Sequence, residues 1–100
     1  MKIIILGGGS IGGSVATELS TEDNDIVVID NNEANLEPLK SKEGIKTVLG
    51  NATSPNTLSK SNLDENSLLL CLTDSEEINL LASIVAHAKF DVKKIICRLK

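Results

Sequence analysis

The sequence contains almost no aromatic residues. It has neither Trp nor Tyr, and Phe90 is the one aromatic side chain among its 100 residues. A core without aromatic rings has to be built from Ile, Leu, Val and Ala, as in layered α/β proteins. One hundred residues suffice for one domain but not for a cofactor domain and a separate substrate domain. A complete two-domain enzyme is therefore excluded.

The sequence also lacks an excess of positive charge and a long apolar run. Ten Lys and Arg residues stand against 14 Asp and Glu residues, which gives a formal net charge of -4. Because a nucleic-acid surface needs clustered cations, we expect no nucleic-acid partner. No apolar run approaches the ~20 residues that cross a bilayer, so we expect no direct membrane insertion. Without a secretory pattern at its start, the chain is expected to be cytoplasmic, with small molecules or proteins as partners.

Groups for catalysis and metal binding are scarce as well. His87 is the single histidine, and Cys71 and Cys97 lie in apolar runs without a nearby histidine. This pattern predicts neither a metal site nor a redox pair. With no Tyr and no paired His, hydride transfer has no visible acid or base. The sequence therefore favours binding without catalysis, and we expect the chain not to be an enzyme.

Short apolar runs alternate with amphipathic stretches along the whole chain. Four of five such runs are apolar at consecutive positions, which predicts strands that helices cover on both faces. The expected fold is a doubly wound, Rossmann-like α/β domain with a parallel sheet. We expect truncation after the fifth strand, with residues 1–100 forming the N-terminal domain of a longer protein. The expected strands are Lys2–Leu6, Asp25–Ile29, Lys46–Leu49, Ser67–Leu72 and Lys94–Cys97.

Four amphipathic stretches are predicted to form helices between these strands. Pro38 interrupts the second, so this helix is expected to be kinked or to begin late. Asp74 and Glu77 form a capping-box-like pair at the start of the fourth. The expected helices are residues 10–20, a segment from an Asn32 cap to near Gly44, residues 54–60, and a segment ending near Lys89.

The last predicted helix is apolar on more than one face. One side carries Ile78, Leu81 and Val85. Another side carries Leu80 and Ile84. One face can pack on the sheet while the other remains for a partner. We therefore expect a homo-oligomer, with symmetric assembly as the default.

A glycine-rich motif, G-x-G-x-x-G, lies between the first strand and the first helix. Gly7 permits a tight turn, and Gly9 allows the backbone to approach a pyrophosphate. Gly12 lets the helix and the strand pack closely. A helix N-terminus also favours an anion through its free N–H groups and its dipole. The backbone donors expected around this anion are those of Gly8, Ser10 and Ile11.

An acidic residue follows at the spacing expected for a dinucleotide site. Asp30 ends the second strand 18 residues after Gly12, where a carboxylate accepts hydrogen bonds from the adenosine ribose. Its charge would repel a 2′-phosphate, and Asn31 follows it in place of an Arg, which favours NAD over NADP. The alternative is an aspartate that only caps a turn or a helix.

The ends of the later strands supply the remaining site candidates. Asn51 and Ala52 follow the third strand, where small and amide side chains can admit an adenine ring. Thr73 and Asp74 follow the fourth strand and would face the glycine turn, and Arg98 follows the fifth. The alternatives are a plain turn at Asn51, a helix cap at Asp74, and an exposed strand-end cation at Arg98.

Four segments together resemble the TrkA-N or RCK domain of Trk potassium-uptake regulatory proteins. They are KIIILGGGSIGGSVATELS, IVVIDNN, GNATSP and LLLCLTDSEEINLLAS. The pattern G-[DNH]-A-[TS] at Gly50–Thr53 separates this family from generic Rossmann enzymes, together with a second group of positions after the next strand. The residues at those later positions are Thr73, Asp74, Glu76 or Glu77, and Asn79. The resemblance implies ligand contacts at Gly7 to Ile11, Asp30, Asn51, Thr73, Asp74 and Arg98.

The resemblance also implies a function. Domains of this family bind NAD(H), and in some members ATP or ADP, on the cytosolic face of a potassium transporter or channel. We therefore expect a regulatory domain, peripheral to the inner face of the cell membrane, whose partners are a Trk-type transporter subunit and further copies of itself. One alternative is the cofactor-binding fragment of an NAD-dependent dehydrogenase. Another is a structural Rossmann domain that binds no nucleotide.

Overall fold

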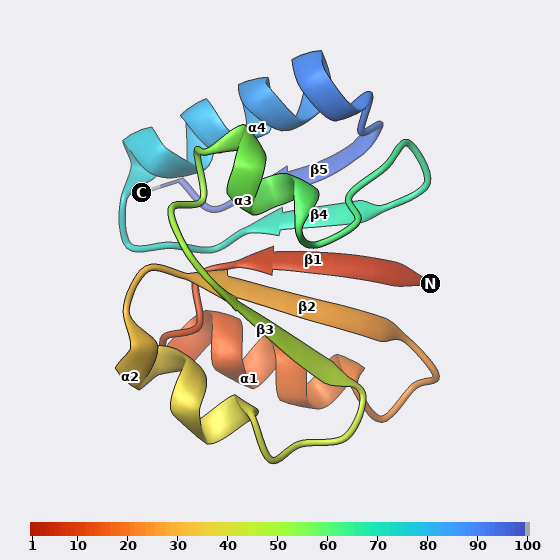
Figure 1. Ribbon diagram of the computed structural model, residues 1–100, viewed down its shortest axis with the longest axis vertical. Coiled ribbons are helices and arrows are strands. Elements are labelled where there is room, and N and C mark those ends of the chain that lie inside the picture. The colour runs from red at the N-terminus through yellow and green to blue at the C-terminus, as the bar shows by residue number, and fades with distance from the viewer. Residues whose placement is uncertain (100) are drawn as a thin grey trace.

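Parallel strands form one sheet in the computed structural model, which describes residues 1–99 (Figure 1). The strand order is β3-β2-β1-β4-β5, so the chain moves outward in one direction from β1 to β3 and then returns to the other side of β1. The boundary between β1 and β4 is therefore the topological switch point, where open α/β sheets bind ligands. The strands are β1 (Lys2–Leu6), β2 (Asp25–Asp30), β3 (Ile45–Leu49), β4 (Leu68–Cys71) and β5 (Lys94–Cys97).

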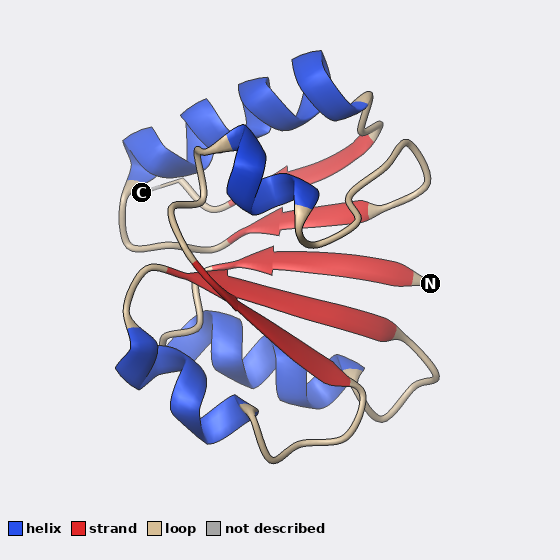
Figure 2. Ribbon diagram, in the orientation of Figure 1, coloured by secondary structure: helices blue, strands red, loops and turns tan. Residues whose placement is uncertain are grey.

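Helices cover both faces of this sheet (Figure 2). On one face lie α1 (Ser10–Leu19), α2 (Glu33–Leu36) and the 3-10 helix η1 (Glu37–Leu39). The other face carries α3 (Pro55–Ser59) and α4 (Glu76–Phe90). This arrangement confirms the predicted doubly wound, Rossmann-like fold. None of the helices within residues 1–99 is long and apolar enough to cross a membrane.

The central strand β1 alternates its side chains between the two layers. Ile3 and Ile5 pack in the cluster beneath α1 and α2, whereas Ile4 and Leu6 pack in the cluster beneath α3 and α4. All four are essentially inaccessible to solvent. Because each such side chain contributes about 1.5–3 kcal/mol when fully buried, β1 is a firm anchor for the glycine turn that follows it.

The predicted strands are all present, and their bounds differ from the prediction by at most one residue. Cys71 lies in the core on β4, where burial raises the pKa of its thiol above the usual range. Cys97 is partly buried on β5, and both cysteines are free. Their role in the described structure is packing, as expected of thiols that lie within apolar strands.

The second helix is shorter than predicted. Asn32 caps it as expected, because its side chain accepts a 3.0 Å hydrogen bond from the N–H of Ala34. Regular α-helix then ends at Leu36, and Pro38 lies in the first turn of η1. Proline lacks the N–H that would continue the α-helix, so the predicted interruption at Pro38 is confirmed as a change to a 3-10 helix, while the predicted extension to near Gly44 is wrong.

The fourth helix departs from the prediction in its cap, and it buries a third side, between the two apolar sides named from the sequence. Ser75 caps it by accepting a hydrogen bond from the N–H of Ile78, so the predicted capping pair of Asp74 and Glu77 is wrong. The residues buried against the sheet are Asn79, Ala82 and Ala86. Small alanines let the helix approach the sheet closely. As a result, the exposed apolar residues of α4 are Ile78, Leu80, Leu81 and Ile84.

Candidate nucleotide-binding site

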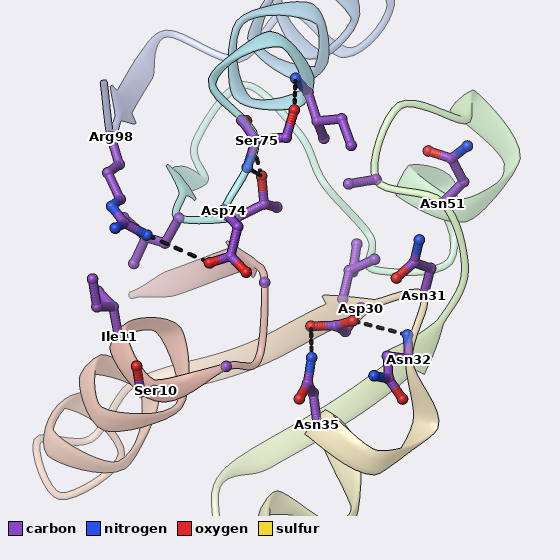
Figure 3. A pocket seen from close by; sticks show the side chains of 17 residues that line it. Ser10, Ile11, Asp30, Asn31, Asn32, Asn35, Asn51, Asp74, Ser75 and Arg98 are labelled. Carbon is purple, nitrogen blue, oxygen red and sulfur yellow. Dashed lines mark hydrogen bonds and ion pairs between the residues drawn. The ribbon is translucent and has the colours of Figure 1, made fainter. Parts of the chain in front are cut away.

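A cavity of about 380 Å³ opens at the carboxyl edge of the sheet, over the switch point between β1 and β4 (Figure 3). Its walls come from the glycine turn, the end of β2 with the start of α2, the turn after β3, the turn after β4, and Arg98. Figure 3 shows amide side chains gathered around Asp30 at one end of the cavity, and Arg98 and Asp74 at the other. Five segments that are far apart in the sequence thus meet at one site.

The glycine turn follows β1 and leads directly into α1. Gly7 has a φ of +102°, a conformation that L side chains rarely adopt. A Cβ on Gly12 would lie 1.8 Å from the carbonyl oxygen of Gly7, so only glycine allows the helix to pack this closely on the turn. A Cβ on Gly9 would meet no atom within 4 Å, because it would point into open space. Gly7 and Gly12 are therefore required by the fold, whereas Gly9 is not.

Helix α1 begins without a side-chain cap. Its N-cap is Gly9, and the first N–H to bond back along the helix is that of Gly13, 2.8 Å from the Gly9 carbonyl oxygen. The N–H groups of Ser10 and Ile11 precede this bond and have no acceptor within the helix. Both residues line the cavity. The positive end of the α1 dipole, with unpaired donors, is thus available to an anion there.

Asp30 connects β2 to the glycine turn and to α2. Its Oδ2 accepts hydrogen bonds from the N–H of Gly8 at 2.7 Å and from Nδ2 of Asn35 at 3.1 Å. Its Oδ1 accepts from the N–H of Asn32 at 2.8 Å. The carboxylate therefore holds the turn in the way that the alternative interpretation of Asp30 required. It also lines the cavity, so a ligand-binding role is open to it as well.

Two glycines in this stretch, Gly8 and Gly12, do not line the cavity. Gly8 donates its N–H to Asp30 and faces the groove between α1 and α2, so this donor is not directed at the cavity. Gly12 lies behind the turn, where it is buried against Gly7. The predicted phosphate donors that the structure brings to the cavity are therefore Ser10 and Ile11.

Asn51 and Ala52 form the wall above Asp30, after β3. Oδ1 of Asn51 accepts hydrogen bonds from the N–H and the Oγ1 of Thr53, at 2.9 and 2.8 Å. Asn51 thus stabilises a turn through its oxygen, as its alternative interpretation proposed. No hydrogen bond engages its Nδ2 within residues 1–99, and the side chain is exposed. Its amide donor is therefore available for a ligand.

The opposite end of the cavity holds a weakly paired cation. Arg98 Nη1 lies 3.8 Å from Oδ1 of Asp74, and the Asp74 side chain is fully exposed. An exposed pair at this distance contributes about 0–1 kcal/mol, so it does little to fix the guanidinium. The backbone of Arg98 is better held, because its N–H donates a 2.9 Å bond to the carbonyl oxygen of Cys71.

Sequence reasoning missed several residues of the site. Asn32, Asn35, Ser75 and Ile78 line the cavity, because the helix starts after β2 and β4 turn toward it. Asn79 is 1% exposed, and its amide bonds Thr73 and the carbonyl oxygen of Arg98 at 2.7–3.1 Å. It therefore fixes the ends of β4 and β5 relative to each other. The family pattern includes Asn79, but the pattern does not show which groups its side chain bonds.

A glycine turn that leads into an uncapped helix, with an acid at the end of the neighbouring strand, is the arrangement of a Rossmann-type nucleotide-binding domain. Comparison with known proteins makes the assignment specific. The family model of the TrkA-N domain matches residues 3–100. The chain therefore belongs to the TrkA-N family, and the resemblance drawn from its sequence is confirmed.

Relatives and solved structures agree with this assignment. The chain is 37% identical over 100 residues to the Trk system potassium uptake protein TrkA of Halomonas elongata, covering all of this chain and 22% of that protein. It is 28% identical over 99 residues to a TrkA homologue of Methanothermobacter thermautotrophicus, covering 99% of this chain and 45% of that protein. The chain thus spans less than half the length of these relatives.

Among solved structures, the TrkA-N domain of the inner membrane protein ybaL from Escherichia coli superposes with a TM-score of 0.81 at 25% identity, over 97% of this chain and 71% of that one. The AMP-bound carboxyl-terminal domain of Kef from Shewanella denitrificans gives 0.82 at 23% identity, over 98% and 58%. A short-chain dehydrogenase/reductase from Veillonella parvula gives 0.76 at 18% identity, over 96% and 45%. The last two show the fold alone.

Proposed function

We propose that this chain is the cytosolic nucleotide-binding regulatory domain of a Trk-type potassium-uptake system and that it binds NAD(H) in the cavity over the switch point. The observation that carries the proposal is the uncapped N-terminus of α1, which opens into the same cavity as the Asp30 carboxylate. One feature suits a pyrophosphate and the other suits a ribose. The relatives named as Trk potassium-uptake proteins supply the physiological setting.

The ligand is expected to lie across the glycine turn. Its pyrophosphate would accept hydrogen bonds from the N–H groups of Ser10 and Ile11. Its adenosine would lie at the end of the cavity that Asp30 and Asn51 form. Among the described residues that line the cavity, Arg98 is the one cation, and it lies at the opposite end. A 2′-phosphate beside Asp30 would therefore meet negative charge without a counter-charge, which favours NAD(H) over NADP(H). ATP or ADP could use the same phosphate donors.

The cavity supports binding better than catalysis. Its described lining contains no His, Lys, Tyr or Cys that could act as an acid or base in hydride transfer. The alternative function is the cofactor-binding half of a dehydrogenase. The fold is compatible with this alternative, because the Veillonella enzyme shares it. Membership of the TrkA-N family favours the regulatory domain. Turnover of NADH with a small oxoacid would favour the dehydrogenase.

Regulation requires a second surface besides the cavity. The exposed apolar side chains on α4, which include Leu81 and Ile84, suit contact with another copy of the domain. Ser75, which caps α4, also lines the cavity, so ligand and interface share one helix. A ligand would alter the assembly only through different affinities for its two states, and the strain would pass to a membrane transporter subunit.

Gly9→Ala tests the proposed binding mode without disturbing the fold. Its new Cβ would meet no protein atom but would occupy the space through which a pyrophosphate approaches. Calorimetric titration of the wild type with NAD⁺, NADH, ATP and NADPH should show saturable binding and rank NADH above NADPH. In Gly9→Ala, NADH affinity should fall by at least about tenfold, the size of a lost charge-assisted hydrogen bond.

Ser14→Ala is the control for this variant. It removes an exposed hydroxyl from α1, outside the cavity over the switch point, and should leave NADH affinity unchanged. Sedimentation with and without the ligand then tests assembly. A wild type that binds none of the four nucleotides would contradict the proposed function.

A further inference from the structure

The carboxylate of Asp30 is nearly saturated by donors from the protein itself. A carboxylate offers about four acceptor positions, two on each oxygen. On Oδ2, one is taken by the N–H of Gly8 and the other by Nδ2 of Asn35. On Oδ1, the N–H of Asn32 takes one. A single position, on Oδ1, is left for a ligand.

The three donors differ in what fixes them. Two are backbone N–H groups, one in the glycine turn and one at the start of α2. The third is the side chain of Asn35, which leaves α2 beside the glycine turn and reaches Oδ2 (Figure 3). Removing this one side chain would therefore free an acceptor on Asp30 without changing the backbone around it.

Asn35 is held in place by the short helical segment that carries it. Its own N–H bonds the carbonyl oxygen of Asn32 at 3.0 Å, and the next residue, Leu36, is 1% exposed in the core. Glu33 and Lys40 form an ion pair across α2 and η1, and this hydrogen bond raises the pKa of Lys40. The segment also packs on the glycine turn, since a Cβ on Gly8 would lie 3.2 Å from the carbonyl oxygen of Asn35.

A nucleotide ribose presents two neighbouring hydroxyl groups, and a free carboxylate can accept one on each oxygen. We propose that Asn35 restricts Asp30 to a single ribose hydroxyl, by occupying the Oδ2 position that a second hydroxyl would need. Asn35 is thus a specificity-determining residue of the cavity. The inference rests on the proposed binding of adenine nucleotides. It adds that the domain recognises one of the two ribose hydroxyl groups and not both.

Replacing Asn35 by an apolar residue removes a polar side chain from the cavity wall, yet it should add ribose recognition. Oδ2 of Asp30 would lose one donor and could accept the second hydroxyl in its place. The variant should then distinguish a complete ribose from both deoxyribose forms, whereas the wild type distinguishes it from only one.

The experiment titrates three probes, AMP, 2′-deoxy-AMP and 3′-deoxy-AMP, by calorimetry. For the wild type, loss of one hydroxyl should weaken binding by at least about tenfold, as expected for a hydrogen bond to a charged group. Loss of the other should change affinity by less than about twofold. For Asn35→Leu, both deoxy probes should bind at least about tenfold more weakly than AMP.

Two further variants complete the design. Asn35→Ala repeats the test with a residue of high helix propensity, in case the leucine perturbs packing. Asn56→Leu makes the same change at an exposed position of α3, away from the cavity, and should keep the wild-type pattern. Thermal unfolding checks that each variant is folded.

The outcomes separate the inference from the proposed function. If the wild type binds AMP but discriminates against both deoxy probes, Asn35 moves aside on binding and the inference is wrong. It is equally wrong if neither Asn35 variant gains discrimination against the second deoxy probe. If the wild type binds no AMP and no NADH, the proposed function itself fails.

Discussion

The two ends of the cavity are built in different ways. At one end the Asp30 carboxylate accepts three hydrogen bonds of 2.7–3.1 Å from the glycine turn and from α2. At the other end Arg98 faces Asp74 across 3.8 Å, and the Asp74 side chain is fully exposed. The first end is organised before a ligand arrives, whereas the second can rearrange at low cost. Recognition should therefore concentrate at the Asp30 end, and adjustment at the Arg98 end.

The largest expected effect is a loss of stability, from a substitution that disrupts the glycine turn between the two ends of the cavity. In Gly12→Ala the new Cβ would overlap the Gly7 carbonyl oxygen at 1.8 Å, so α1 cannot keep its position on the turn. The free energy of unfolding should fall by more than about 4 kcal/mol, a loss that single substitutions cause only through severe steric or packing defects. Urea unfolding followed by circular dichroism measures it. Gly9→Ala, with open space at its Cβ, should lose no more than about 1 kcal/mol, the scale of replacing an N-cap glycine by alanine.

The second prediction concerns the organised end. Asp30→Ala removes the proposed ribose acceptor and leaves its donors in the turn poorly paired, so NADH binding should weaken by about 1.5–3 kcal/mol. Removal of the negative charge also relieves the repulsion of a 2′-phosphate. The preference for NADH over NADPH should therefore shrink.

Calorimetry with both cofactors measures these changes, and residual binding through the N-terminus of α1 should remain. Thermal unfolding must first show that the variant is folded. Unchanged affinity for NADH, or an unchanged ratio between the two cofactors, would mean that Asp30 only stabilises the turn.

Features that depend on local sequence could be predicted, whereas contacts between distant residues could not. The strands, the glycine turn and Asp30 follow from local patterns, because consecutive apolar residues and fixed spacings determine them. The partners of Asp30 could not be predicted. Gly8 lies 22 residues before Asp30, and the position of Asn35 depends on where α2 begins after its Asn32 cap.

The fourth helix shows the same limit on packing. Its apolar residues outnumber the positions that face the sheet, so hydropathy alone left open which of its two apolar sides is buried. The helix instead buries Asn79, Ala82 and Ala86, since Asn79 finds partners at the ends of β4 and β5. A buried polar residue is favoured only where its hydrogen bonds are satisfied, and sequence alone does not show those partners.

The third prediction moves to the adjustable end. Arg98→Ala removes a partly buried cation from the cavity wall while its backbone bond to Cys71 remains. NADH affinity should fall by about two- to fivefold at low salt, as for a partly solvated charge contact. The loss should shrink as ionic strength rises, because salt screens this end of the cavity. Titration at two salt concentrations measures both changes. AMP, placed at the Asp30 end, should respond less than NADH.

The smallest effect, and the only one of opposite sign, is expected at Asp74. The side chain is fully exposed and does not cap α4, since Ser75 does, so Asp74→Ala should leave the thermal unfolding temperature unchanged. Its removal frees Arg98 and takes a negative charge away from the place where the proposed anionic ligand would bind. NADH affinity should therefore rise, by less than about threefold, which is the scale of an exposed ion pair. The gain should shrink in the double variant with Arg98→Ala, because only the removal of the negative charge then contributes to it. The same Asp→Ala change would then weaken binding at one end of the cavity and strengthen it at the other. A loss of affinity in Asp74→Ala as large as that in Asp30→Ala would show instead that Asp74 contacts the ligand, and that both ends of the cavity are organised for recognition.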